Sequence, residues 1–328
     1  MKRILVPFTL LLLLAIVICP AVSAQTQDEP VVLTIDVENT VIYRGTVFDA
    51  SKIAKDPGPT TSVNQAFVDA INIGDIVAIN GKPVKGIWSS TVYSTPYRAN
   101  PQPGQLIADF DLAGTNFCTW QIYDTDGTFL GMIRDSGAGQ GHTIVGALAG
   151  FFGDMGAHVG GTTTVPMRQA SIGEDPANRR ILGGGKMNVV FYLYPRFRPA
   201  VMVTDSGPAV SHMDYSPVTN ASPARPGETL ILAATGLGPV KPDLLPPGAV
   251  AFSGPPYQQV NAPVTVAFNG KELPVISKIG WPGQKTVYWV DFQVPADAAA
   301  GTATLSLIST WIPGPAVSIP VGSLPVVK

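Results

Sequence analysis

The chain has 328 residues, of which 13% are charged, and its formal net charge at pH 7 is -2. This balance excludes the basic surface that nucleic acid or an anionic membrane requires, and a hydrophobic content of 45% excludes a disordered chain. With 34 glycines and 31 prolines, the composition is typical of many short strands joined by turns.

The N-terminus has the layout of a secretory signal. Lys2 and Arg3 precede a largely apolar run over residues 4–18, and the small residues at 21–24 offer a cleavage site before Gln25. A membrane anchor usually needs about 20 apolar residues. We therefore expect residues 1–24 to be removed and the protein to be exported to the periplasm, the medium or the cell surface.

Cleavage of that signal would also remove Cys19 and leave Cys118 as the only thiol. The predicted mature protein then has no intramolecular disulfide, so its fold must be held by core burial. We expect Cys118 to be a small buried hydrophobic residue rather than a nucleophile or a metal ligand.

Most elements expected in the first half are strands. A helix is predicted only over residues 62–71, where Ser62 can cap the first turn. Within residues 74–88, Asn80-Gly81 predicts a type I′ hairpin turn, and Asp126-Gly127 predicts a second turn. Further strands are expected over residues 106–112, 117–123, 129–133 and 187–194, with Asp109 and Asp111 pointing outwards and with Cys118, Trp120 and Ile122 on one face.

Segments of the first half follow one another in an informative order: Trp120–Gly127, Gly131, His142–Gly146 and Gly150–Gly156. This series resembles the dirigent and allene oxide cyclase barrel superfamily. The resemblance implies an antiparallel eight-stranded β-barrel over residues 25–198, with an apolar cavity and, in many members, assembly into oligomers. Residues 146–149 replace the glycine-rich turn of the family, and Met155 replaces its arginine.

A Pro-rich segment after Tyr194 places the domain boundary near Pro199. Beyond it, strands are predicted over residues 229–234, 264–268, 273–277, 287–294, 303–309 and 316–321, with a hairpin turn at Asn269-Gly270. The face formed by Tyr288, Val290 and Phe292 is apolar, as expected for a strand with one buried face.

Motifs of the second half also stand in a recognisable order. They are residues 207–210 (GPAV), 226–228 (PGE), 234–239 (ATGLGP), 264–270 (VTVAFNG) and 291–295 (DFQVP). The series resembles the immunoglobulin-like C-terminal domain that recurs in secreted proteins of soil bacteria. The resemblance implies an immunoglobulin-like β-sandwich over residues 199–328, attached to varied N-terminal modules and without a catalytic role.

Sequence motifs give little support for catalysis or metal binding. His142, His158 and His212 are 16 and 54 residues apart, which matches no zinc-ligand spacing, so no metal site and no cofactor are predicted. Residues 124–127 lack the further carboxylates of a calcium loop. The glycines at 183–185 precede a strand rather than a helix, unlike a phosphate-binding loop. Asp135-Ser136-Gly137 and Asp205-Ser206-Gly207 are interpreted as turns, not as nucleophile elbows.

Aromatic residues with a polar tip could line an apolar ligand cavity. The candidate ligand-binding residues are Trp88, Trp120, Tyr123, His142 and Tyr192. For two of them, a role other than ligand binding stays open. Trp120 is favoured as a core residue, and His142 could lie at a solvated strand end instead of facing the barrel.

The sequence favours a secreted binding or structural protein that is not an enzyme. Its barrel would hold a small apolar ligand or self-associate into a homo-oligomer, and its sandwich would act as a spacer or an adhesive module on an extracellular polymer. The alternative is a dirigent- or cyclase-like enzyme, which needs a fixed acid or cation inside the barrel. Asp109, Asp111 and Arg134 are the candidates for that charge.

Overall fold

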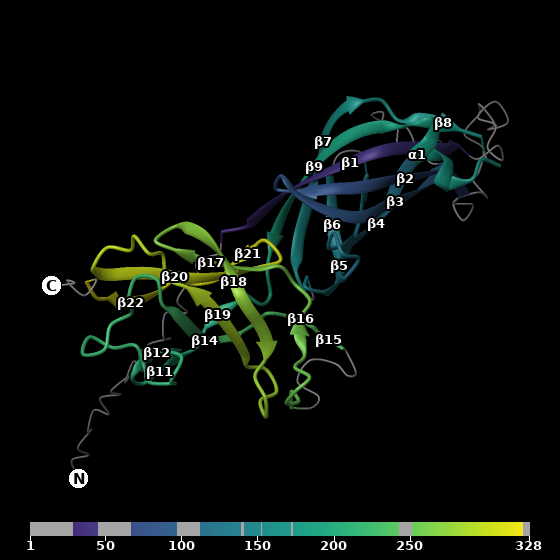
Figure 1. The fold of residues 1–328 in the computed structure, drawn as a ribbon. Helices are drawn as coiled ribbons and strands as arrows, with labels where there is room; N and C mark the ends of the chain where they lie inside the picture. Colours follow the sequence, from purple (N-terminus) through teal and green to yellow (C-terminus); the bar gives the residue numbers. More distant parts are fainter. Residues whose placement is uncertain are drawn as a thin grey trace, which may run out of the picture.

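The computed structural model describes residues 29–44, 67–96, 112–138, 141–151, 153–171, 173–242 and 251–323. Its strands form a closed barrel up to Tyr194 and a second curled sheet from Ala200 onwards (Figure 1). The predicted all-β class is thereby confirmed. The predicted signal segment lies outside the described residues, as do Asp109 and Asp111. No helix within the described ranges is long and apolar enough to cross a membrane.

Eight antiparallel strands close the barrel in the order β2-β3-β4-β5-β6-β7-β9-β1, because β1 also pairs with β2. They are β1 (Val31–Arg44), β2 (Phe67–Ile79), β3 (Lys82–Pro96), β4 (Leu112–Tyr123), β5 (Phe129–Ala138), β6 (Gly141–Ala149), β7 (Met155–Val165) and β9 (Gly185–Tyr194). A short strand, β8 (Arg168–Ala170), lies parallel to the end of β1.

Local sequence explains the hairpins and faces that were predicted. Asn80 and Gly81 have φ values of 49° and 73°, which is the positive region that a type I′ turn requires, and they join β2 to β3. On β4, Cys118, Trp120 and Ile122 all lie inside the barrel, as the period of two indicates.

Two local predictions are wrong. Residues 67–71 belong to β2 rather than to a helix, because their backbone pairs with β3; residues 62–66 lie outside the described part. Asp135-Ser136-Gly137 is not a turn but the end of β5, where each residue pairs with both β4 and β6.

The short segment that connects β8 to β9 contains the helical residues. A 3-10 turn, η2 (Pro176–Asn178), begins after Asp175, whose carboxylate accepts a hydrogen bond from the Ala177 amide. It continues into α1 (Arg179–Leu182), which ends at Gly183 with φ 77°. This segment places the side chains of Arg179 and Arg180 against β2 from outside the barrel.

The second body is one sheet that curls on itself, with the main order β10-β14-β19-β18-β17-β20-β21. Its longer strands are β14 (Thr229–Thr235), β17 (Val264–Phe268), β18 (Lys271–Gly280), β19 (Tyr288–Gln293), β20 (Gly301–Ser309) and β22 (Val317–Val321). The short ones are β10 (Ala200–Val201), β13 (Val210–Ser211), β15 (Val240–Lys241), β16 (Gln259–Val260) and β21 (Ile312–Pro313). Beside this sheet, β11 (Val203–Thr204) and β12 (Gly207–Pro208) pair with each other in a separate two-stranded sheet.

The two bodies contact each other at the end of the barrel, where β21 lies (Figure 1). Ile312 of β21 is 2% exposed and belongs to the hydrophobic core of the barrel. Lys82 pairs with Glu272 at 2.6 Å, and the Lys241 ammonium donates to the Thr128 hydroxyl at 2.6 Å. The second sheet therefore holds the β2-β3 and β4-β5 turns of the barrel.

Truncation of Ile312 tests that contact. We expect Ile312→Val to lower the free energy of unfolding by about 1 kcal/mol, because a buried methylene is lost from the barrel core. Ile276→Val is the matched control, since Ile276 is 63% exposed on β18 and should change stability by less than about 0.5 kcal/mol. Urea unfolding of both variants gives the comparison, and equal effects would contradict the described contact.

Candidate functional site

Large aromatic side chains fill part of the barrel interior. Trp88 and Trp120 lie with their ring centroids 5.8 Å apart, and Phe191 packs edge-on against Trp120 at 5.1 Å. All three are at most 5% exposed. The inward face that was predicted to line a ligand cavity is, at these residues, a packed core.

Beside this core lies a buried polar cluster that we call the Asp135 cluster: Cys118, Asp135, His142 and His158. They come from β4, β5, β6 and β7, and the strand register brings them together, since Cys118 pairs with Asp135 and His142 pairs with His158. The Asp135 carboxylate accepts from Nδ1 of His142 at 2.6 Å and from the Trp120 indole N–H at 2.5 Å.

His158 completes the cluster on the other carboxylate oxygen. Its Nδ1 lies 3.1 Å from Oδ2 of Asp135 but makes no hydrogen bond with acceptable geometry, although His158 is only 6% exposed. The two imidazole centroids are 4.2 Å apart. The cluster therefore gathers two imidazole nitrogens, an indole N–H and a thiol around one carboxylate, and all these side chains are buried.

Burial and neighbouring charges shift two pKa values in opposite directions. Desolvation alone would raise the pKa of Asp135, but His158, His142 and Trp120 stabilise its carboxylate and hold the pKa below the ordinary value. Desolvation, followed by the charge of Asp135, raises the pKa of Cys118 to about 12. The Asp135 cluster therefore has an ionised aspartate and a protonated thiol.

This geometry does not make a Cys-His-Asp catalytic triad. A triad needs the nucleophile on one imidazole nitrogen and the carboxylate on the other. Here Cys118 Sγ lies 3.6 Å from Nδ1 of His142, which is the same nitrogen that bonds to Asp135. His142 cannot take the thiol proton there while it donates to the carboxylate, and a thiol with a pKa near 12 is not a nucleophile at neutral pH.

The same residues are the ones that could hold a metal ion. One ligand atom each from Cys118, Asp135 and His142 lie within 4.8 Å of one another, and all three side chains are buried. Prediction from spacing gave no sign of this group, because the ligand atoms come from separate strands rather than from one loop or helix.

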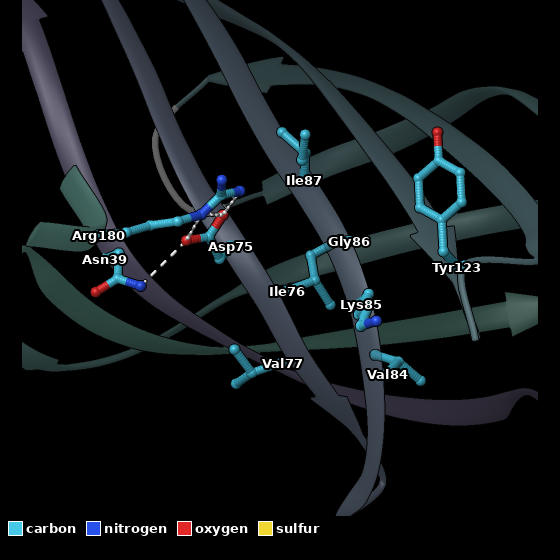
Figure 2. Close-up of a pocket in the computed structure, with 11 residues that line it drawn as sticks. Asn39, Asp75, Ile76, Val77, Val84, Lys85, Gly86, Ile87, Tyr123 and Arg180 are labelled. Atoms are coloured by element: carbon cyan, nitrogen blue, oxygen red, sulfur yellow. Dashed lines mark hydrogen bonds and ion pairs between the residues drawn. The ribbon is translucent and has the colours of Figure 1, made fainter. Parts of the chain in front are cut away.

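A second candidate site is a hollow on the outer face of the barrel, over β2 and β3, which we call the outer hollow. Its volume is about 490 Å³, within the range of small-molecule sites. Lys85, Ile87 and Tyr123 line it beside the Asp75 and Arg180 pair (Figure 2). Asn39, Asp75 and Arg180 lie together on one side of the hollow, and Lys85 lies next to Val84 and Gly86 (Figure 2).

Charges at the rim are held by Asp75. Figure 2 shows its carboxylate between Arg180 and Asn39, which donate to it at 2.7 Å and 3.1 Å. Arg179 pairs with Oδ1 of Asp75, the oxygen that also accepts from Arg180. Desolvation would raise the pKa of Asp75, but Arg180, Asn39 and Arg179 lower it below its ordinary value. Among the residues that line the hollow, Arg180 and exposed Lys85 are cationic and Asp75 is the one carboxylate, which leaves an excess of positive charge.

Comparison with known proteins identifies no family. No protein-family model matches the chain, and no curated protein matches it. Among solved structures, a similar chain is the N-terminal domain of the Streptococcus gordonii adhesin Sgo0707, at 12% sequence identity and a TM-score of 0.19, covering 89% of this chain and 92% of that one. At that TM-score the likeness carries no argument, so the dirigent-like and immunoglobulin-like resemblances stay resemblances.

The five predicted ligand-binding residues fall into three places. Trp88, Trp120 and His142 lie inside the barrel, so the solvated strand end considered for His142 is wrong. Tyr123 is half-buried at the outer hollow, and Tyr192 is 40% exposed on β9. Arg134, a candidate for a lumenal charge, is exposed on β5, whereas its neighbour Asp135 points inwards.

Sequence reasoning missed Asp135, His158 and Asp75. For Asp135 and His142 a signal was present, because each lies two residues from an inward isoleucine, Ile133 and Ile144, on the same strand. The position of Asp75 gave no such signal, since its arginine partners lie more than a hundred residues further along the chain.

Proposed function

We propose that this chain is an exported, non-catalytic binding protein that takes its ligand in the outer hollow of the barrel. The observation that carries the proposal is the hollow itself, about 490 Å³ with an apolar wall and a cationic rim. The barrel interior is filled at Trp88, Trp120 and Phe191. A ligand in the lumen, the first idea from the sequence, would have to displace these side chains.

The chemistry of the hollow indicates the class of ligand. Tyr123 and Ile87 offer a flat apolar surface, and Lys85 and Arg180 offer cations for a carboxylate. An acidic sugar unit has one apolar face and one carboxylate, so a uronic acid segment of an extracellular polysaccharide matches both. Since the hollow lies on the outer face, a polymer can enter and leave it at either end.

The enzyme alternative has one observation in its favour, because Asp135 is a fixed carboxylate inside the barrel. A dirigent- or cyclase-like enzyme also needs space for its substrate next to that charge. Around Asp135, however, the nearest groups are the imidazoles and the indole of Trp120, which occupy its oxygens. We therefore favour binding without catalysis.

Calorimetric titration of the full chain with trigalacturonate tests the proposal, with neutral trigalactose as the matched ligand. We expect binding of the acidic trimer and at least about tenfold weaker binding of the neutral one, because a charge-assisted hydrogen bond is worth about 1.5 kcal/mol or more. Tyr123→Ala should weaken binding by about threefold to tenfold through the lost ring contact.

Two control variants make the result specific to the hollow. Tyr192→Ala removes an exposed tyrosine from the barrel surface outside the hollow, and Lys285→Gln removes an exposed lysine from the loop between β18 and β19. Both should bind as the wild type does, whereas Lys85→Gln should lose preference for the acidic trimer. No binding, or equal loss in Tyr192→Ala and Tyr123→Ala, would overturn the proposal.

A further inference from the structure

We propose that the Asp135 cluster is a metal site that binds one zinc ion inside the barrel through Cys118, Asp135 and His142, with His158 as the fourth ligand. The inference is independent of the outer hollow. It starts from composition: the chain has three histidines, and two of them meet at one buried aspartate, next to the cysteine expected to remain after signal removal.

The donor atoms already stand close to the spacing that zinc requires. In a tetrahedral site with bonds of about 2.0–2.3 Å, neighbouring ligand atoms are about 3.3–3.6 Å apart. The ligand atoms of Cys118, Asp135 and His142 lie within 4.8 Å of one another, with Cys118 Sγ and His142 Nδ1 3.6 Å apart. Nδ1 of His158 approaches the other carboxylate oxygen of Asp135, Oδ2, at 3.1 Å. To admit the ion, the hydrogen bond between His142 and Asp135, at 2.6 Å, must open, and Nδ1 of His158, which faces Oδ2 of Asp135, must turn towards the ion.

The metal-free arrangement leaves polar groups poorly satisfied. Nδ1 of His158 is buried without a hydrogen-bond partner, and it is aimed at the cluster. The Cys118 thiol contacts a nitrogen that already donates to Asp135. Buried polar groups without partners are costly. A cation at the centre would give all four atoms a role and would compensate the charge of the carboxylate.

The ligand set favours zinc over the other common divalent cations. A thiolate and two imidazoles are borderline-soft donors, which calcium and magnesium do not take. Binding has a clear proton balance: the thiol gives up one proton to form the thiolate ligand, and each neutral histidine coordinates through Nδ1 while its ring proton is on Nε2, so one proton is released to water as the ion enters. No redox change is involved.

Neighbouring side chains are placed to support the ligands. The Trp120 indole N–H donates to Oδ2 of Asp135, which fixes the carboxylate and leaves Oδ1 for the ion. Nε2 of His142 lies 3.4 Å from the Asn116 side-chain amide, and rotation of that amide would present its oxygen to the ring N–H.

The test uses the full chain, stripped of metal with a chelator and titrated with Co²⁺ as a spectroscopic substitute for zinc. We expect one Co²⁺ per chain, tetrahedral d–d bands and a thiolate-to-cobalt charge-transfer band, all displaced by Zn²⁺. Cys118→Ser should abolish the charge-transfer band, and His158→Gln should weaken binding by at least about tenfold. His212→Gln is the matched control, since His212 lies in the second body against Glu228 and should change nothing.

Absent tetrahedral bands in the wild type, or a charge-transfer band retained in Cys118→Ser, would overturn the site. If a variant fails to fold, X-ray absorption at the zinc edge of the wild type decides. One sulfur neighbour at about 2.3 Å with nitrogen or oxygen neighbours at about 2.0–2.1 Å is the expected result. Nitrogen and oxygen neighbours alone would contradict the proposal. Sugar binding in the outer hollow is measured separately, so either proposal can fail without the other.

Discussion

Replacement of Asp135 with alanine is expected to lower the free energy of unfolding by about 3–5 kcal/mol, because it leaves buried partners of a charged group unpaired. The Asp135 side chain is fully buried and faces His142, His158 and Trp120. Loss of the carboxylate leaves His142 and the Trp120 indole N–H without their hydrogen-bond acceptor in the barrel core and removes the charge next to His158. Urea unfolding of the metal-stripped protein, followed by tryptophan fluorescence, measures the change.

Glu272→Ala is the control for this experiment. Glu272 also pairs with a basic side chain, Lys82, but both partners are about half exposed. Surface ion pairs contribute about 0–1 kcal/mol, so the control should change stability little. Similar losses in the two variants would show that Asp135 does not organise the core. Because the pKa of Asp135 is lowered in the folded protein, its carboxylate stabilises the fold above about pH 4, and this stabilisation is lost as the pH falls further.

Asp154, in contrast to Asp135, is expected to destabilise the folded protein when its carboxyl group is ionised. It is 6% exposed, and one of its carboxylate oxygens has no hydrogen-bond partner. Desolvation raises its pKa to about 7, against the backbone N–H of Arg196 and the charge of Arg198, which lower it. In the folded protein this carboxyl therefore keeps its proton to a much higher pH than in the unfolded chain.

The sign of the pH effect follows from that difference. Between about pH 4 and about pH 7, the unfolded chain loses the Asp154 proton while the folded chain keeps it, so stability falls as the pH rises. A shift from 3.8 to about 7 corresponds to a change on the order of 4 kcal/mol. Above about pH 7 both states are ionised and the curve becomes flat. Asp135 and Asp75, with lowered pKa values, titrate below this window.

Asp154→Asn should remove most of this slope. The variant keeps an oxygen for the Arg196 amide, which lies 3.0 Å away, but carries no proton to lose. Asp205→Asn, in the exposed turn between β11 and β12, should keep the wild-type slope. Free energies of unfolding at about pH 5 and about pH 8 give the comparison. Parallel curves for the wild type and Asp154→Asn would show that another group is responsible.

Local sequence rules predicted much of the fold. Asn80-Gly81 and Asn269-Gly270 both form tight turns with positive φ, because glycine and asparagine tolerate that conformation best. The alternation over Tyr288, Val290 and Phe292 predicted which side chains are buried in the second sheet. The failure at residues 67–71 has a different origin, since their helical pattern is overridden by pairing with β3.

The sites were harder to predict than the fold, because they depend on register. Cys118, Asp135, His142 and His158 meet only when β4, β5, β6 and β7 are aligned residue by residue. A shift of one residue in any strand would turn its cluster member to the outside. Asp75 and Arg180 likewise meet only because α1 crosses back over β2. Motif spacing along the chain contains none of this information.

Chemical-shift mapping shows directly whether the ligand binds in the outer hollow. The backbone amide and indole signals of the isotope-labelled chain would be followed as trigalacturonate is added. We predict shifts at Lys85, Ile87, Tyr123 and Gly127, which line the hollow, with the indole signals of Trp88 and Trp120 unchanged. Shifts confined to those indoles would place the ligand in the lumen, and that result would contradict the proposed function.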